Sequence, residues 1–71
     1  MNGLSIGRMV HFVNKEGHHR PAIVIEVVDQ VKGVANLQVF NAKKRSVRNT
    51  SHEMKRKFSE EHLINTWHWM D

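Results

Sequence analysis

The stretch PAIVIEVVDQVKGVANLQVFN, residues 21–41, carries the strongest structural signal in this sequence. It holds two apolar segments rich in β-branched residues, and QVKG between them is short enough for a hairpin turn that closes at Gly33. Pro21 can open the first segment as a strand, because a proline at the first position removes no ladder hydrogen bond. The stretch therefore predicts two adjacent antiparallel strands.

Alternation of side chains predicts which face of these two strands is buried. In the first strand we expect the odd-numbered positions to face the core, because Glu26 lies on the even face. In the second strand, Asn36 and Gln38 place the even face in solvent. The expected core residues are Ile23, Ile25, Val27, Ala35, Leu37 and Val39.

The segment before this hairpin predicts one more strand. IGRMVHFV, residues 6–13, alternates with Val10 and Phe12 on one face. NKEGHHR then breaks the pattern, as a loop or hairpin turn would.

Three segments after the hairpin complete the predicted elements. RSVRNTSH, residues 45–52, predicts a strand with Val47 pointing inward, and MKRKF after it has no clear periodicity. SEEHLINT predicts a single helical turn, because Ser59 can cap its free amides and the two glutamates that follow favour the positive end of its dipole. TWHWM resumes strand alternation, with Trp67 and Trp69 on one face and His68 on the other.

Five short strands predict a mainly β fold, a small SH3-like five-stranded barrel with a short helical turn before the last strand. The alternative is an open antiparallel sheet with one packed helix. A chain of 71 residues is expected to form a single domain, residues 1–71. Trp67 and Trp69 are expected to fill the interior, each burying on the order of 200 Å², or to form a partly exposed seam in a homo-oligomer.

Composition narrows the compartment and the partners. The chain has no cysteine, so it can form neither a disulfide nor a thiolate zinc site. No run approaches the roughly 20 apolar residues that cross a bilayer, and the start lacks the features of a secretory signal, so we expect a cytosolic protein without membrane contact. The net charge of +4 favours anionic partners.

Three motifs, GRMVHFV, PAIVIEV followed by ANLQVFN, and the terminal TWHWM, occur together in this order. In this combination the chain resembles a group of small, mostly uncharacterised bacteriophage and prophage proteins. It differs from that group at Met70, where the group usually has proline, and at Asn65, where a glycine normally precedes the threonine. The resemblance implies a phage origin, a host bacterial cytoplasm and a small β-rich fold, and it assigns no catalytic or ligand-binding residue.

Residues 43–57 hold seven of the eleven basic side chains and one acid, Glu53, which gives a local charge of about +6. Such a stretch attracts a phosphate backbone without reading bases, and Phe40 or Phe58 would add a stacking surface for an unpaired base. The alternative role is a charged edge that prevents strand-to-strand aggregation. The predicted nucleic-acid-binding residues are Lys43, Lys44, Arg45, Arg48, Lys55, Arg56 and Lys57.

A second hypothesis is a protein-interaction module, either a virion or assembly component or an inhibitor of a host factor. It rests on an expected apolar face around Val24, Val28 and Phe40. The partner would then be a host or phage protein rather than a nucleic acid.

A third hypothesis is a metal-dependent enzyme built on histidines. His11, His18, His19 and His68 would converge if the first and last strands pair, and imidazoles suit zinc, copper or nickel. However, two adjacent histidines in a loop do not have a chelating spacing, and the sequence has no phosphate loop, no paired carboxylates between apolar flanks and no nucleophile motif. We therefore predict no enzyme, no cofactor and no metal site.

Overall fold

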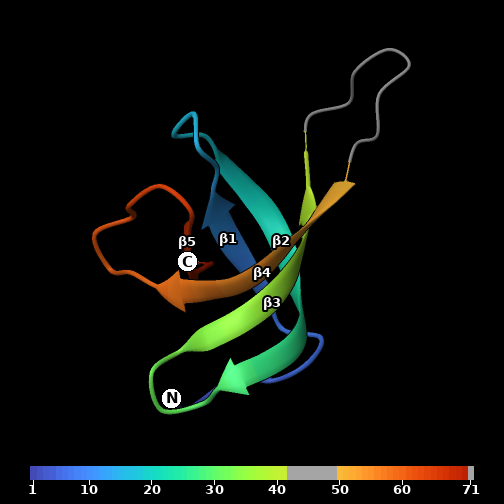
Figure 1. Ribbon diagram of the computed structural model, residues 1–71, viewed down its shortest axis with the longest axis vertical. Coiled ribbons are helices and arrows are strands. Elements are labelled where there is room, and N and C mark those ends of the chain that lie inside the picture. The colour runs from blue at the N-terminus through green and yellow to red at the C-terminus, as the bar shows by residue number, and fades with distance from the viewer. Residues whose placement is uncertain (42–49, 71) are drawn as a thin grey trace.

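The computed structural model describes residues 1–41 and 50–70, which form a closed five-stranded barrel (Figure 1). The strands follow one another around the barrel in chain order, and β5 closes it by pairing antiparallel with β1 and parallel with β4. The SH3-like barrel predicted from the sequence is confirmed, and the open sheet is excluded. The strands are β1 (Met9–Val13), β2 (His19–Asp29), β3 (Val34–Phe40), β4 (Thr50–Phe58) and β5 (Thr66–Trp69).

The hairpin of β2 and β3 forms as predicted, and Gly33 closes it. The Gly33 amide donates to the Asp29 carbonyl at 2.9 Å, and the backbone of Gly33 has φ 73°, a conformation that suits glycine. The Gly33 carbonyl accepts hydrogen bonds from the Phe58 amide at 3.0 Å and from Trp67 Nε1 at 2.9 Å. The turn between β2 and β3 is therefore hydrogen-bonded to both later strands, β4 and β5.

Strand β2 begins earlier than predicted, at His19, so Pro21 is its third residue. Pro21 lies opposite His11 of β1, and the pairing of β2 with β3 starts only at Ala22. The missing amide hydrogen of Pro21 therefore costs no bond to β3, which explains why a proline is tolerated inside this strand.

The buried face of β2 is the even face in its first half, so the expectation for Ile23 and Ile25 is wrong. Ala22 and Val24 are buried, whereas Ile23 is half-buried and Ile25 is 38% exposed. The β2–β3 register shifts between Val24 and Glu26 and again between Val27 and Asp29. Each shift exchanges the inward and outward faces of the strand. Val27 follows the first shift, so this odd-numbered residue packs against the core as predicted.

Asn36 is buried rather than solvent-exposed, with 5% of its surface accessible. Its Nδ2 donates to Glu26 Oε1 at 2.8 Å, and its Oδ1 accepts from the Lys55 amide at 2.7 Å. Lys55 has φ 53°, and the β3–β4 register shifts between Ala35 and Leu37. The side chain of Asn36 therefore provides a hydrogen-bond acceptor for a backbone amide of the bulge, instead of facing water.

The interior of the barrel is filled by apolar side chains from the amino-terminal segment and from β1, β2, β3 and β5. Trp67 is fully buried, and Trp69 and Phe58 pack partly buried beside it, as the sequence predicted for the tryptophans. Ring centres lie 5.1 Å apart for Phe58 and Trp67, and 5.0 Å apart for the two tryptophans. The core is Leu4, Val10, Phe12, Ala22, Val24, Ala35, Leu37, Val39 and Trp67.

The segment before β5 differs from the prediction in two ways. Strand β4 continues through MKRKF to Phe58, and the bulge at Lys55 explains why this segment lacks periodicity in the sequence. The predicted helical turn is replaced by turns at residues 60–61 and 64–65, where His62 and Asn65 have positive φ angles. Residues 45–49 of the predicted fourth strand, including Val47, lie outside the described residues.

No helix in the described part of the chain is long and apolar enough to cross a membrane.

Candidate functional site

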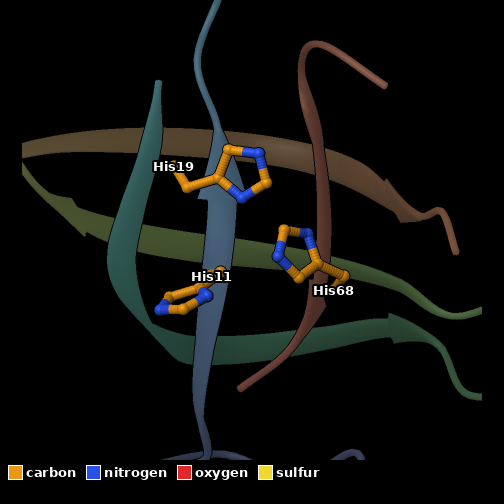
Figure 2. Close-up of side chains that lie close together, drawn as sticks. All are labelled: His11, His19 and His68. Carbon is orange, nitrogen blue, oxygen red and sulfur yellow. The ribbon is translucent and has the colours of Figure 1, made fainter. Parts of the chain in front are cut away.

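Three strands that are neighbours in the barrel bring three histidines together on its outer surface (Figure 2). His11 of β1 lies directly opposite His68 of β5, and His19 begins β2 opposite Val13. One ring nitrogen from each histidine lies within 4.8 Å of the other two, and the rings turn toward a common space. We call His11, His19 and His68 the histidine cluster.

The three members of the histidine cluster differ in how firmly they are held. His68 is 5% exposed, His11 is half-buried and His19 is exposed. The rings of His11 and His68 meet edge to face with centres 5.4 Å apart, and those of His19 and His68 with centres 4.9 Å apart. His68 is thus the fixed member, while the other two have room to turn.

A further histidine, His62, covers the cluster from the loop between β4 and β5. Its ring stacks on that of His68, with centres 3.6 Å apart and an angle of 17° between the planes, and its centre is 5.3 Å from that of His19. No pattern in the sequence pointed to His62, because the loop has no periodicity that would place it. Only the turn geometry of this loop brings His62 over β5.

His18, the fourth histidine expected at the site, is outside the cluster that the described residues form. It is exposed at the turn between β1 and β2, where its amide donates to Asn14 Oδ1 at 2.9 Å. Successive residues of an extended chain point in opposite directions, so His18 and His19 cannot both face His11. The condition that β1 and β5 pair is met, but only three of the four expected histidines converge.

A hollow of about 240 Å³ lies beside the histidine cluster. Phe58, Glu60, His62, His68 and Trp69 line it. His68 therefore borders both the other histidines and this hollow. The lining of the hollow includes the aromatic rings of Phe58 and Trp69 and the carboxylate of Glu60.

Of the basic residues predicted to bind nucleic acid, the structure places three, Lys55, Arg56 and Lys57, on β4, which pairs antiparallel with β3 (Figure 1). We call residues 34–58 the basic hairpin. Lys55 and Lys57 are exposed on β4, with Lys57 opposite Val34. The other four predicted lysines and arginines, Lys43, Lys44, Arg45 and Arg48, lie outside the described residues.

Arg56 is positioned differently from the two lysines. It is half-buried opposite the inward-facing Ala35, and its Nη2 is 2.7 Å from Glu53 Oε1. Its guanidinium carbon lies 5.8 Å from the centre of the Phe12 ring. The structure therefore does not bring Arg56 together with Lys55 and Lys57 on one face, and it uses Arg56 to neutralise Glu53.

The two phenylalanines proposed as stacking surfaces also differ. Phe58 packs against Trp67 and Trp69 and is partly covered. Phe40 ends β3 and is 37% exposed, on the same face as Gln38 and its exposed partner His52. Phe40 is therefore the more exposed of the two and the better candidate for stacking on an unpaired base.

A second hollow, of about 430 Å³, lies at the end of the barrel next to Arg56 and Glu53. Lys15 and Glu16 also line it, so its charged lining consists of two cations and two carboxylates. This balance of charge favours no anionic ligand over a cationic one.

The chain was compared with protein-family models, with curated proteins and with solved structures, and none of the three comparisons found a match. The resemblance to small phage proteins stays a prediction. What bears on function is therefore the charge of the basic hairpin and the geometry of the histidine cluster.

Proposed function

We propose that this protein is a small phage-encoded accessory module that acts in the host bacterial cytoplasm and contacts nucleic acid through the basic hairpin. The observation that carries the proposal is the distribution of charge. Residues 43–57 hold seven of the eleven basic side chains, and Glu53, their one acid, is already bonded to Arg56. A strand of phosphates next to this hairpin would meet cations with almost no opposing carboxylate.

The geometry of β4 supports contact with phosphates rather than with base edges. Lys55 and Lys57 are exposed, and Arg56 forms an ion pair with Glu53. Lysines are flexible point charges that bind a phosphate backbone without a fixed register. We therefore expect weak binding that does not depend on sequence, with a dissociation constant of about 10⁻⁴ to 10⁻⁶ M.

Phe40 adds a reason to expect a preference for single strands. Its exposed ring lies at the end of β3, opposite Thr50, where β4 begins. An aromatic ring beside a basic surface stacks on unpaired bases, and each stacked base contributes about 1–3 kcal/mol. Replacing Phe40 with alanine should weaken binding of a single strand more than binding of a duplex.

The test is fluorescence anisotropy of labelled single-stranded and duplex oligonucleotides with untagged protein up to about 100 μM in about 50 mM salt. Two charge-reversal variants probe the basic hairpin: K43E/K44E/R45E/R48E, and K55E/K57E. The matched control is K15E/K32E, which makes the same change in net charge as K55E/K57E at two exposed lysines outside the hairpin. Circular dichroism verifies that each variant is folded.

We expect both hairpin variants to lose binding while K15E/K32E retains most of it. Equal losses in K55E/K57E and K15E/K32E would mean that net charge alone, and not the hairpin, attracts the oligonucleotide. Absence of any anisotropy change with the wild-type protein would overturn the proposed function.

A protein-interaction module is the second candidate, and exposed apolar side chains on β2 favour it. Val28 is 44% exposed and Ile25 is 38% exposed, although Val24, which was expected on this face, is buried. A pull-down from host lysate with and without nuclease separates the two candidates. A stoichiometric protein that survives nuclease and is lost with Val28→Glu would support this candidate, and recovery of no such protein would contradict it.

A further inference from the structure

We propose that the histidine cluster is a binding site for a divalent late transition metal, with Zn²⁺ as the ion to test first. His11, His19 and His68 would supply three imidazole nitrogens, and water would fill the fourth position. Neither the charge of the basic hairpin nor its proposed partner enters this inference. It reverses the expectation, drawn from the sequence, that the histidines bind no metal.

The donor set fits this class of ion. Neutral imidazole nitrogen is a ligand for zinc, copper and nickel, whereas calcium and magnesium prefer oxygen ligands. The group of possible ligands in the described residues consists of the three histidines without a carboxylate. Three histidines with one open position form a known type of zinc coordination.

The distances require a small adjustment of the side chains. In a tetrahedral zinc site with Zn–N bonds of about 2.0–2.1 Å, two ligand nitrogens are roughly 3.4 Å apart. The nitrogens of the histidine cluster lie within 4.8 Å of one another, so those of His11 and His19 have to move by roughly an ångström. His19 is exposed and His11 is half-buried, so both have room to turn toward the buried His68.

The backbone under the cluster is already in place. His11 and His68 are direct partners in the antiparallel β1–β5 register. Side chains at directly paired positions point to the same face, with Cβ atoms about 4.5–5.5 Å apart. His19 is attached to the strand on the other side of β1, so the three ligands are held by the barrel itself and binding need not order a loop.

His62 is a positioning residue in this proposal. Its ring stacks on that of His68 and covers one face of that ligand, which limits rotation of the His68 ring. Residues that orient a ligand typically contribute about 10- to 100-fold to metal affinity. His62→Ala should therefore weaken zinc binding, and nuclear magnetic resonance should show a loss of order in the His68 ring even without zinc.

The experiment is a titration of untagged, chelator-treated protein with Zn²⁺, monitored by competition with a chromogenic chelator. Co²⁺ replaces Zn²⁺ in a second titration, because its visible spectrum reports the number of ligands and their geometry. His11→Ala and His19→Ala remove accessible ligands with little risk to folding, and His68→Asn tests the buried ligand. The matched controls are His18→Ala and His52→Ala, which remove exposed histidines outside the cluster.

We expect one equivalent of Zn²⁺ to bind wild-type protein and both control variants, and His11→Ala and His19→Ala to lose at least a factor of about 100 in affinity. His68→Asn should also lose zinc binding, provided that its circular dichroism spectrum is that of the wild type. Resonances of His11, His19 and His68 should shift together at one equivalent. Equal weakening in His18→Ala or His52→Ala, or no saturable binding of either ion, would overturn the site.

Discussion

The histidine cluster and the basic hairpin lie on different parts of the same barrel, and they differ in how the chain builds them. The basic hairpin takes its charge from residues 43–57, which are close together in the sequence. The histidine cluster takes one residue from each of β1, β2 and β5, and its members meet only because β5 closes the barrel against β1. A site of local origin can be found by counting charges, whereas a site of tertiary origin needs the strand register.

The two surfaces also differ in the physics of their proposed ligands. Attraction of a phosphate backbone is Coulombic, acts over a Debye length and weakens as salt is added. Coordination of a metal requires nitrogens at bonding distance and is insensitive to moderate salt.

Trp67→Ala should remove both surfaces at once. The side chain is fully buried, and its Nε1 donates to the Gly33 carbonyl at 2.9 Å. Loss of a buried tryptophan costs about 3–5 kcal/mol, which is most of the stability of a small domain. Urea denaturation followed by circular dichroism should show a largely unfolded variant.

Met70→Ala is the control for Trp67→Ala, because Met70 is the exposed residue that follows β5. It should change the free energy of unfolding by less than about 0.5 kcal/mol. A Trp67→Ala protein that unfolds cooperatively at the wild-type urea concentration would contradict the position of Trp67 in the core.

Raising the salt concentration should separate the two surfaces. With about four phosphate contacts, an increase from roughly 50 to 200 mM salt weakens duplex binding about 100-fold. Zinc affinity should change by much less, because the metal is held by short coordinate bonds. Parallel titrations of oligonucleotide and Zn²⁺ at both salt concentrations measure the difference, and an equal response of both ligands would show that one electrostatic surface binds them both.

Asn36→Ala should disturb the basic hairpin more than the histidine cluster. The substitution leaves the Lys55 amide and the Glu26 carboxylate without the partner they have at 2.7 and 2.8 Å. An unsatisfied buried group costs about 1–3 kcal/mol, and here it loosens the bulge that presents Lys55. Hydrogen exchange should increase in β4, and oligonucleotide affinity should fall while zinc binding is retained.

Gln38→Ala provides the control for Asn36→Ala, since Gln38 lies on the same strand and is only half-buried. Its effect on exchange in β4 should be smaller. If the two substitutions had equal effects, the hydrogen bonds of Asn36 would not be what holds the bulge.

Glu53→Gln should produce the smallest effect, and it should strengthen one function. Removing the carboxylate raises the net charge of the hairpin by one and releases Arg56 from its ion pair. A partly exposed ion pair contributes at most about 1 kcal/mol, so the loss of stability should be small. Oligonucleotide affinity should rise a few-fold at low salt, Zn²⁺ affinity should stay the same, and Glu16→Gln, at an exposed acid in the β1–β2 turn, should give a smaller rise.

Much of the fold was predictable because it depends on neighbours in the sequence. The two apolar segments, the turn at Gly33, the alternation in β1 and β3, and the inward Trp67 all follow from short-range patterns. Errors occur where a bulge interrupts such a pattern. The odd face of β2 and the solvent position of Asn36 were both predicted by assuming an unbroken period of two, which the register shifts violate.

The candidate sites divide in the same way. The seven basic residues were identified from the sequence, although Arg56 turns out to be engaged by Glu53. From the sequence, His11, His18, His19 and His68 were expected to converge only if β1 and β5 pair, and no pattern pointed to His62. No local pattern distinguishes His19, which joins the cluster, from His18, which does not.

By itself, the sequence determined the strand-forming segments, the turn that joins β2 and β3, and the concentration of positive charge between residues 43 and 57. These properties depend on backbone preference, side-chain alternation and composition, which are local. The tertiary structure decided which face of β2 is buried, where Asn36 and Arg56 find their partners, and which histidines meet. Those outcomes depend on strand register and barrel closure, which the chain settles by packing Trp67 and its neighbours in one shared interior.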